Sequence, residues 1–438
     1  MFYHNTKFKF ALAEGSPSTI PGGIIAAHAM PAGQLLRRVR KDMRKNAYLQ
    51  HRLFDPQMYL ATLDANIARR PVVNLASHQW FAAHDVPEYD SDQHGTMKQW
   101  KDDHEDALVS TWRRSPPSDA ISIAAATEAA IRYQVDLGCE AIILPSPLTT
   151  IAAAGYEAEV AWMNAGLDAC RELRVSIPIY ATIALSDTVL RGVDPLRHPL
   201  LHMITSQIAA RDNLAGAYVV MEQTSEDGYA CSTRETLLSL LLIVDDLARG
   251  AGKQSIVNYA GMFGAITKAV GAHVWSVGYY LSQRRLKLAD FDERTGFAYP
   301  RFFSAKLNGD IGLESHLPAA VSSGFGDRLL TDTAASRPLR AALESGSYPA
   351  AVPQWTYRPG NITAAAAHFN EVACKVGTAL HSLSRVEKIE LTNRRLRESV
   401  ALVDQLRGIG IERSSSTDLL HQRVWLQVFE EWRSFARM

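Results

Sequence analysis

Short apolar runs, separated mostly by stretches with helical periodicity, dominate the pattern along this chain of 438 residues. Several of the runs are continuously hydrophobic, which is typical of parallel strands that are covered on both faces. The eight runs lie at residues 7–15, 52–60, 71–77, 141–148, 177–185, 216–223, 255–261 and 273–280. The pattern therefore predicts eight parallel strands connected by helices.

Eight consecutive β-α units favour a (β/α)8 TIM-like barrel. Closure of the sheet leaves no edge strand, and every crossover keeps the same hand. An open, doubly wound sheet is the structural alternative. Beyond the eighth run, the chain first loses its clear period and then regains a helical one. We therefore expect an α/β fold with a barrel over residues 1–300, an irregular extension over 301–360 and a C-terminal helical segment over 361–438.

The pattern of the last segment predicts three helices, with breaks near Ser382 and at residues 408–416. In the middle helix, apolar residues recur at spacings of three, four and seven, at Val386, Ile389, Leu396, Val400 and Val403. This apolar face is expected to be buried. Packing on the barrel is favoured over an oligomer or complex partner, because a coiled coil would have only about two to three heptads.

The composition is that of an ordinary globular protein. Lys plus Arg and Asp plus Glu number 46 each, so the net charge gives no general attraction to nucleic acid or to an anionic membrane. The four cysteines form no CxxC pair, which favours reduced thiols. The sequence has no run of 18 apolar residues, and its first residues do not follow a signal-peptide pattern. We expect a cytoplasmic protein without membrane attachment.

Two local segments depart from this neutral balance. The first is basic, and its charges are Arg37, Arg38, Arg40, Lys41 and Arg44. It predicts either a solvated surface helix or a patch that contacts the phosphates of a nucleic acid. The second, residues 78–106, is rich in His and acidic residues, and it is either a solvated loop, a lid over the active site or a metal-binding loop. Its spacings match no compact ligand motif, so we predict no metal site and no cofactor.

Polar residues at the ends of the apolar runs are the candidates for chemistry, because barrel active sites lie at the carboxyl ends of strands. Asp55 lies in the second run, after its expected strand, and Glu222 lies at the end of the strand expected in the sixth run, and both are flanked by apolar residues. Partial burial would raise the pKa of each carboxyl and suit it to acid or base catalysis, unless each is simply paired in the barrel mouth.

Further candidates surround these two carboxyls and would bind the substrate. After the seventh run, a glycine-containing loop leads into a helix whose free amides can bind an anion, with an arginine following the eighth run. Gly261, Gly264 and Arg284 are therefore expected to hold phosphate. The complete set of predicted substrate-binding residues is Gln57, His78, Gln223, Asn258, Tyr259, Gly261, Gly264, Ser276 and Arg284.

One stretch of about 70 residues, from Gly216 to Arg285, carries a recognisable succession of elements. A strand, a charged loop, a helix, a second strand, a glycine-containing loop and a short helix precede a Gly-x-(acid or polar)-x-aromatic strand and an arginine-bearing loop. This succession resembles the corresponding part of tRNA-guanine transglycosylases and their DNA-modifying relatives. The segment from Phe54 to Gln57 stands where that family has its Asp-led substrate loop. Ser276 replaces the attacking aspartate of the family, and its zinc-binding cysteine cluster has no counterpart.

The resemblance implies a barrel that binds a purine-like base or nucleotide and acts on nucleic acid, as a base-exchanging glycosyltransferase or a related C–N bond enzyme. A serine at position 276 cannot attack a ribose carbon without an activating base, so exchange by the usual route is not expected. One alternative is a catalytically inactive barrel that docks nucleic acid or protein as a subunit of a larger complex. Another is an unrelated barrel lyase or hydrolase that acts on a small phosphorylated metabolite.

Overall fold

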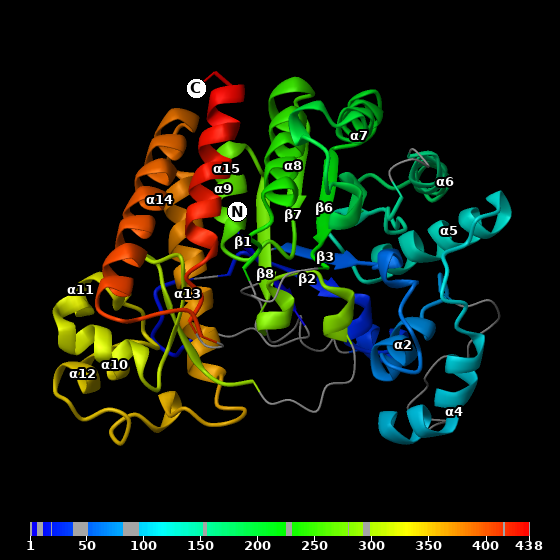
Figure 1. The fold of residues 1–438 in the computed structure, drawn as a ribbon. Helices are drawn as coiled ribbons and strands as arrows, with labels where there is room; N and C mark the ends of the chain where they lie inside the picture. Colours follow the sequence, from blue (N-terminus) through cyan, green and yellow to red (C-terminus); the bar gives the residue numbers. More distant parts are fainter. Residues whose placement is uncertain are drawn as a thin grey trace.

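Parallel strands and the helices between them form the body of the molecule (Figure 1). The computed structural model describes residues 2–6, 12–18, 20–37, 51–81, 96–151, 156–224, 230–278, 280–291, 298–414 and 417–437. The strands of the main sheet are β1 (Phe2–Thr6), β2 (Gly22–Ala26), β3 (His51–Asp55), β4 (Ile142–Ile143), β5 (Ile179–Ser186), β6 (Gly216–Glu222), β7 (Gln254–Val257) and β8 (Val274–Gly278). They pair in parallel, in the order β3-β2-β1-β8-β7-β6-β5-β4.

This sheet is curled, because strands far apart in its order contact one another. Tyr218 of β6 donates a hydrogen bond to Asp55 of β3 at 2.6 Å, although the two strands are five positions apart. In a flat sheet, strands at that separation would lie about 24 Å apart. Beside β4, the Glu140 N–H donates to the Arg52 carbonyl of β3 at 3.1 Å. A strand ladder between β3 and β4 is not formed in the part of the chain that is described, so the structure shows a curled parallel α/β sheet.

Burial explains why the central strands have continuous apolar sequences. Every residue of β5 and of β6 is buried, as expected of strands with neighbours on both faces. The helices that follow the strands are α2 (Arg69–Ala76), α4 (Met97–Thr111), α5 (Ala120–Asp136), α6 (Glu157–Glu172), α7 (Pro199–Ala209), α8 (Arg234–Asp245) and α9 (Phe263–Val270). Short helical turns used below are η1 (Ala27–Ala29), η2 (Met58–Leu60), η5 (Pro195–Arg197), η7 (Leu281–Gln283) and η8 (Leu288–Phe291).

Six of the predicted strands correspond to β3–β8, but the beginning of the chain differs. Residues 71–77, predicted as a strand, lie almost entirely in helix α2, because a short apolar run does not by itself distinguish a strand from a buried helix. Residues 12–15 of the first predicted run are not in a strand, and residues 7–11 lie outside the described residues. The two remaining strands are β1 and β2, which no predicted run covered.

Residues 301–360 contain more regular structure than we expected of this extension. An antiparallel ribbon and three short helices occur here: β9 (Arg301–Ser304), β10 (Gly309–Gly312), α10 (His316–Ala320), α11 (Gly326–Leu329) and α12 (Arg337–Glu344). Their apolar side chains, with Phe302, Ile311 and Trp355 among them, form a cluster that also includes Leu402 and Leu406. The extension therefore shares its core with the C-terminal helices.

The C-terminal segment forms three helices: α13 (Thr363–His381), α14 (Arg385–Gly408) and α15 (His421–Phe435). The breaks between them confirm those predicted from the sequence. These helices lie against α8 and α9 on one side of the sheet (Figure 1). Of the face predicted to be buried, Ile389 and Leu396 of α14 join the same apolar cluster as β5 and β6, and Val403 joins the cluster of the extension. Val386, in the first turn of the helix, is instead exposed, so the prediction was wrong at that position. No helix in the described ranges is both long and apolar enough to cross a membrane.

Candidate functional site

Asp55, the last residue of β3, carries a buried carboxyl group inside the curled sheet, and only 1% of the residue is exposed. The hydroxyls of Tyr59 and Tyr218 donate to its Oδ2 at 2.5 and 2.6 Å, and the Gln57 N–H donates to its Oδ1 at 3.1 Å. Burial raises the pKa of Asp55 to about 6, and these hydrogen bonds lower the pKa by less. This carboxyl therefore titrates close to neutral pH, as suits an acid or base catalyst.

Among the described residues, the surroundings of Asp55 contain no compensating cation. Within the described ranges, no lysine or arginine forms an ion pair with it. Asp245, which is also 1% exposed, instead pairs with two arginines, Arg249 and Arg385. Because burying a charge is costly unless it is paired, Asp55 differs from Asp245 in the partners that hold it.

Hydrogen bonds continue from Asp55 to the ends of β2 and β7. Asn258 donates through Nδ2 to the Tyr218 hydroxyl at 2.6 Å, and Gln57 donates through Nε2 to the Tyr259 hydroxyl at 3.0 Å. The Gln57 Oε1 accepts from the His28 backbone N–H at 2.9 Å and lies 2.8 Å from His28 Nδ1. A backbone N–H can only donate, so this oxygen is an acceptor and His28 carries its hydrogen on Nδ1. The network thus connects β2, β3, β6 and β7.

Two residues of this network have a strained backbone. Gln57 has φ 55° and Tyr259 has φ 58°, which is the left-handed region that favours glycine. Such a conformation costs on the order of 1–3 kcal/mol at a residue with a side chain, and it is concentrated at functional sites. The two strained residues are hydrogen-bonded to each other beside Asp55.

Glu222, the second predicted carboxyl, is the last residue of β6 and is 6% exposed. Burial raises its pKa, although the Ser186 hydroxyl and the Leu288 N–H donate hydrogen bonds to it. Asp187 also raises this pKa, and Arg191 lowers it. Glu222 is thus held at the carboxyl end of the sheet by a backbone donor from beyond β8.

The two carboxyls occupy different depths. Glu222 and Tyr218 are four residues apart on β6, so their side chains face the same side of the strand, about 13 Å apart along it. Asp55 lies at the depth of the Tyr218 hydroxyl. In the part of the chain that is described, no hydrogen bond joins Asp55 to Glu222.

Gln223 and Ser276 present buried polar atoms at the same end of the sheet. The Gln223 Oε1 and the Ser276 Oγ have no hydrogen-bond partner among the described residues. Ser276 is fully buried on β8, and the pairing of Val257 with Trp275 brings it beside Asn258. A buried polar atom without a partner calls for a water or a ligand.

His78 lies apart from this network. Its ring centroid is 4.5 Å from that of Trp80, 5.2 Å from that of Tyr133 and 6.0 Å from that of Phe54. Phe54 precedes Asp55 and so points to the opposite face of β3. Burial lowers the pKa of His78 to about 4. His78 therefore belongs to an aromatic cluster between β3 and the surrounding helices.

The residues predicted to hold phosphate lie where the sheet meets the extension and the C-terminal helices. A Cβ atom on Gly264 would lie 2.2 Å from the Trp275 ring, so glycine permits close packing of α9 on β8. Arg284 lies 3.3 Å from an Asp310 carboxylate oxygen, and its guanidinium carbon lies 3.4 Å from the centre of the Phe369 ring. Burial lowers the pKa of Arg284. These contacts already neutralise the cation that a phosphate would need.

Three residues of the network were not among the predicted site residues: His28, Tyr59 and Tyr218. Tyr218 had a signal in the sequence, because a hydroxyl in the middle of a continuous apolar strand needs a buried partner. Tyr59 lies in η2, four residues after Asp55, and its hydroxyl returns to that carboxylate. His28 lies in η1, directly after a strand that was not predicted, so no strand end marked it.

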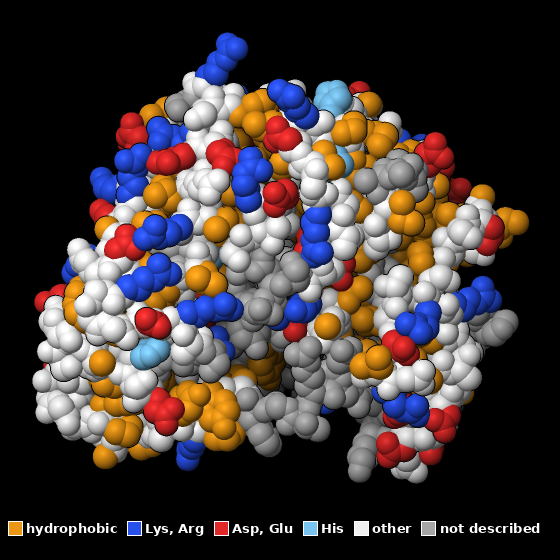
Figure 2. All heavy atoms as spheres, in the orientation of Figure 1, with side chains coloured by type: hydrophobic (Ala, Val, Ile, Leu, Met, Phe, Trp, Pro, Cys, Tyr) orange, Lys and Arg blue, Asp and Glu red, His pale blue; other side chains and the backbone are white. Residues whose placement is uncertain are grey.

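Most of the basic segment lies outside the described residues. Arg37 is described and exposed, whereas Arg38, Arg40, Lys41 and Arg44 lie outside the described residues, as do residues 82–95 of the acidic insertion. On the face shown in Figure 2, Lys and Arg side chains alternate with Asp and Glu. Nowhere in the described ranges do three or more His, Cys, Asp or Glu side chains gather as metal ligands.

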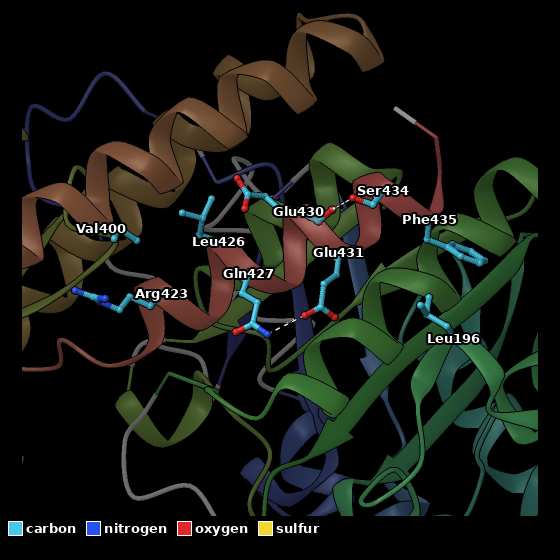
Figure 3. A pocket seen from close by; sticks show the side chains of 9 residues that line it. All are labelled: Leu196, Val400, Arg423, Leu426, Gln427, Glu430, Glu431, Ser434 and Phe435. Atoms are coloured by element: carbon cyan, nitrogen blue, oxygen red, sulfur yellow. Dashed lines mark hydrogen bonds between the residues drawn. The ribbon is translucent and has the colours of Figure 1, made fainter.

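A surface groove of about 670 Å³ lies between α15, Val400 of α14 and Leu196 of η5 (Figure 3). Its lining is mainly apolar, and its charged side chains are paired within the chain. Glu431 pairs with Arg234, and Glu430 pairs with Arg397, each at 2.6 Å. The groove therefore offers no reactive group comparable to Asp55.

Comparison of the chain with models of known protein families and with curated proteins finds no match. The assignment of a site therefore depends on the geometry around Asp55.

Proposed function

We propose that the chain is a closed (β/α)8 barrel, similar to base-exchanging transglycosylases, that binds a purine-like base or nucleotide at the carboxyl ends of its strands. The observation that carries this proposal is the buried Asp55 carboxyl, which has no ion-pair partner in the described part of the chain and a pKa raised to about 6. It stands among hydrogen-bonding side chains from four strands. Such convergence of polar groups at strand ends is where barrel enzymes build their active sites.

The hydrogen bond across the sheet supports the closed barrel. Asp55 and Tyr218 meet in the interior, and Glu140 bonds to Arg52 where β3 lies beside β4. Both contacts are those of a sheet whose end strands face each other.

The chemistry proposed for Asp55 follows from how its two oxygens are used. The Oδ2 accepts two tyrosine hydroxyls, whereas the Oδ1 accepts only one backbone N–H, so a proton on the carboxyl belongs on Oδ1. A protonated Oδ1 can donate to a ring nitrogen of a purine, and an ionised one can accept from a ring N–H. At a C–N bond, the protonated form serves as the general acid for the departing base. Glu222, Gln223, Asn258 and Tyr259 would line the path to it.

Calorimetric titration with free purine bases and with pyrimidine bases tests this proposal. We expect purines to bind and pyrimidines not to bind, with purine affinity changing between pH 5 and pH 8 as Asp55 titrates. Asp55→Asn should abolish the pH dependence. Asp246→Asn, in an exposed carboxyl directly after α8, is the control and should leave it intact. Equal binding of both base classes, or unchanged titrations for Asp55→Asn, contradicts the proposal.

A further inference from the structure

Residues 280–291, which we call the strap, follow β8 and cross the carboxyl end of the sheet at the lower end of β8 in Figure 1. In the middle of the strap, the Leu286 carbonyl accepts a hydrogen bond from the Gln223 N–H, just after β6, at 2.8 Å. At its end, the ring of Phe291 lies edge-on to that of His28, just after β2, with 4.9 Å between centroids. Because β2 and β6 are four positions apart in the sheet, the strap spans the mouth of the curled sheet.

The strap inserts apolar side chains into this mouth. Leu286 is fully buried, in the same apolar cluster as Tyr218 and Tyr259. Leu288 and Phe291 pack against that cluster. The segment thus contributes to the burial of the network below, where Asp55 and Gln57 are each 1% exposed.

Polar contacts hold the strap in place. The Leu288 N–H donates to the Glu222 carboxylate, and Glu222 and Leu286 form a parallel backbone bridge. Within the strap, Arg285 and Asp290 pair at 2.9 Å, with 5% and 9% of their side chains exposed. Glu222 therefore contacts the strap rather than the network around Asp55.

We propose that the strap is a removable closure of the carboxyl-end mouth, and that Glu222 is the positioning residue that latches it. In the closed form, the strap seals the Asp55 network from solvent. It has to leave β6 and β2 before a ligand can reach Asp55. The contacts of the strap define the closed form, and the opening rests on the proposed function, because a ligand that reaches Asp55 has to pass the strap.

A cysteine placed beneath the strap reports on opening. Ser276→Cys is nearly isosteric, and the native residue is buried with an unpartnered hydroxyl. The four native cysteines are all buried, so they give a low background. We expect slow modification of the new thiol by methyl methanethiosulfonate. Adding Leu286→Ala or Glu222→Ala should accelerate it about tenfold or more, because each change weakens the closed form. Leu196→Ala, at a surface leucine of η5, is the control and should leave the rate unchanged.

Unchanged rates in both strap variants overturn the proposal. A strap variant that also exposes the native cysteines cannot report on opening. Hydrogen exchange in the unaltered protein then measures whether the strap opens. The amides of the strap should then exchange about tenfold or more faster than those of β6, and equal protection of the two segments contradicts a removable closure. Neither measurement uses a purine, so failure of the closure and failure of the proposed base binding are separate results.

Discussion

Asp55 and Asp245 are equally buried carboxylates in two regions of the molecule, and their surroundings differ completely. Asp245, at the end of α8, receives Arg249 from its own helical turn and Arg385 from α14, the latter at 2.7 Å. From the described residues, Asp55 inside the sheet receives two tyrosine hydroxyls and one backbone amide. The first arrangement joins α14 to α8, whereas the second leaves a buried carboxyl whose pKa is raised to about 6.

The difference separates a buried carboxylate held by cations from one held by neutral donors. Cations beside a buried carboxylate offset part of the cost of its desolvation. Around Asp55, the fold adds backbone strain at Gln57 and Tyr259 instead of a cation. The proposed function of Asp55 rests on these features.

The largest change in stability should come from a substitution of Asp245. Asp245→Ala removes the partner of two arginines at the contact between α8 and α14, and we expect it to lower the free energy of unfolding by about 3–5 kcal/mol. Urea unfolding followed by circular dichroism measures this loss. The neighbouring Asp246→Ala is the control, and it should cost little because burial and Asp245 raise the pKa of Asp246 in the folded chain. Similar losses of stability at both positions would contradict the claim that the two ion pairs of Asp245 stabilise the fold.

Asp55 should instead change how stability depends on pH. Its pKa is about 6 in the folded chain and ordinarily 3.8, so the folded state binds the proton more tightly. Its contribution is therefore fully present below pH 3.8 and is lost as the pH rises to about 6, by up to about 3 kcal/mol. The difference in unfolding free energy between the unmodified protein and Asp55→Asn should fall over this range. A difference that rises over the same pH range would mean that folding lowers the pKa of Asp55, which contradicts the prediction.

A third comparison tests whether Gly264 is needed for the packing of α9 on β8. Gly264→Ala places a methyl group against the Trp275 ring and should destabilise the protein by about 1–3 kcal/mol through overpacking. Gly250→Ala, where a Cβ would meet nothing within 4 Å, is the control. Equal stability of the two variants in urea would contradict the close packing of α9 on β8.

The smallest effect concerns one hydroxyl beside Asp55. Tyr218→Phe removes a donor to the ionised carboxylate, so the pKa of Asp55 should rise further, by about one unit. Tyr180→Phe on the adjacent strand β5 removes a hydroxyl that donates to Gln254 at 2.5 Å, and it should leave the pKa unchanged. Infrared titration of the carboxyl group measures both. A fall in the pKa after Tyr218→Phe would show that the hydroxyl does not donate to Asp55.

Much of the fold followed from the apolar pattern, and its failures have a common cause. Strands β5 and β6 are long, continuously apolar and β-branched or aromatic in character, so they were predicted at nearly the correct bounds. Residues 71–77 have the same apolar character but too short a run to show a helical period. β2 begins with two glycines, which read as a turn rather than as a strand.

The site was predicted in part because strand ends mark it. Asp55, Gln57, Asn258 and Tyr259 lie in one network as expected. The network also depends on His28 and Tyr218, whose hydrogen bonds span 29 and 163 residues of sequence. Contacts at such separations are set by the curl of the sheet, which no local pattern encodes.

The titration of Asp55 is the most direct test of the claim that it is an uncompensated, functional carboxyl. Infrared difference spectra between the unmodified protein and Asp55→Asn, collected as the pH is raised, isolate the carbonyl band of its protonated form. We predict that this band disappears with a midpoint near pH 6. A midpoint at or below the ordinary value of 3.8 would mean that Asp55 is stabilised as a charge, like Asp245, and would contradict the account.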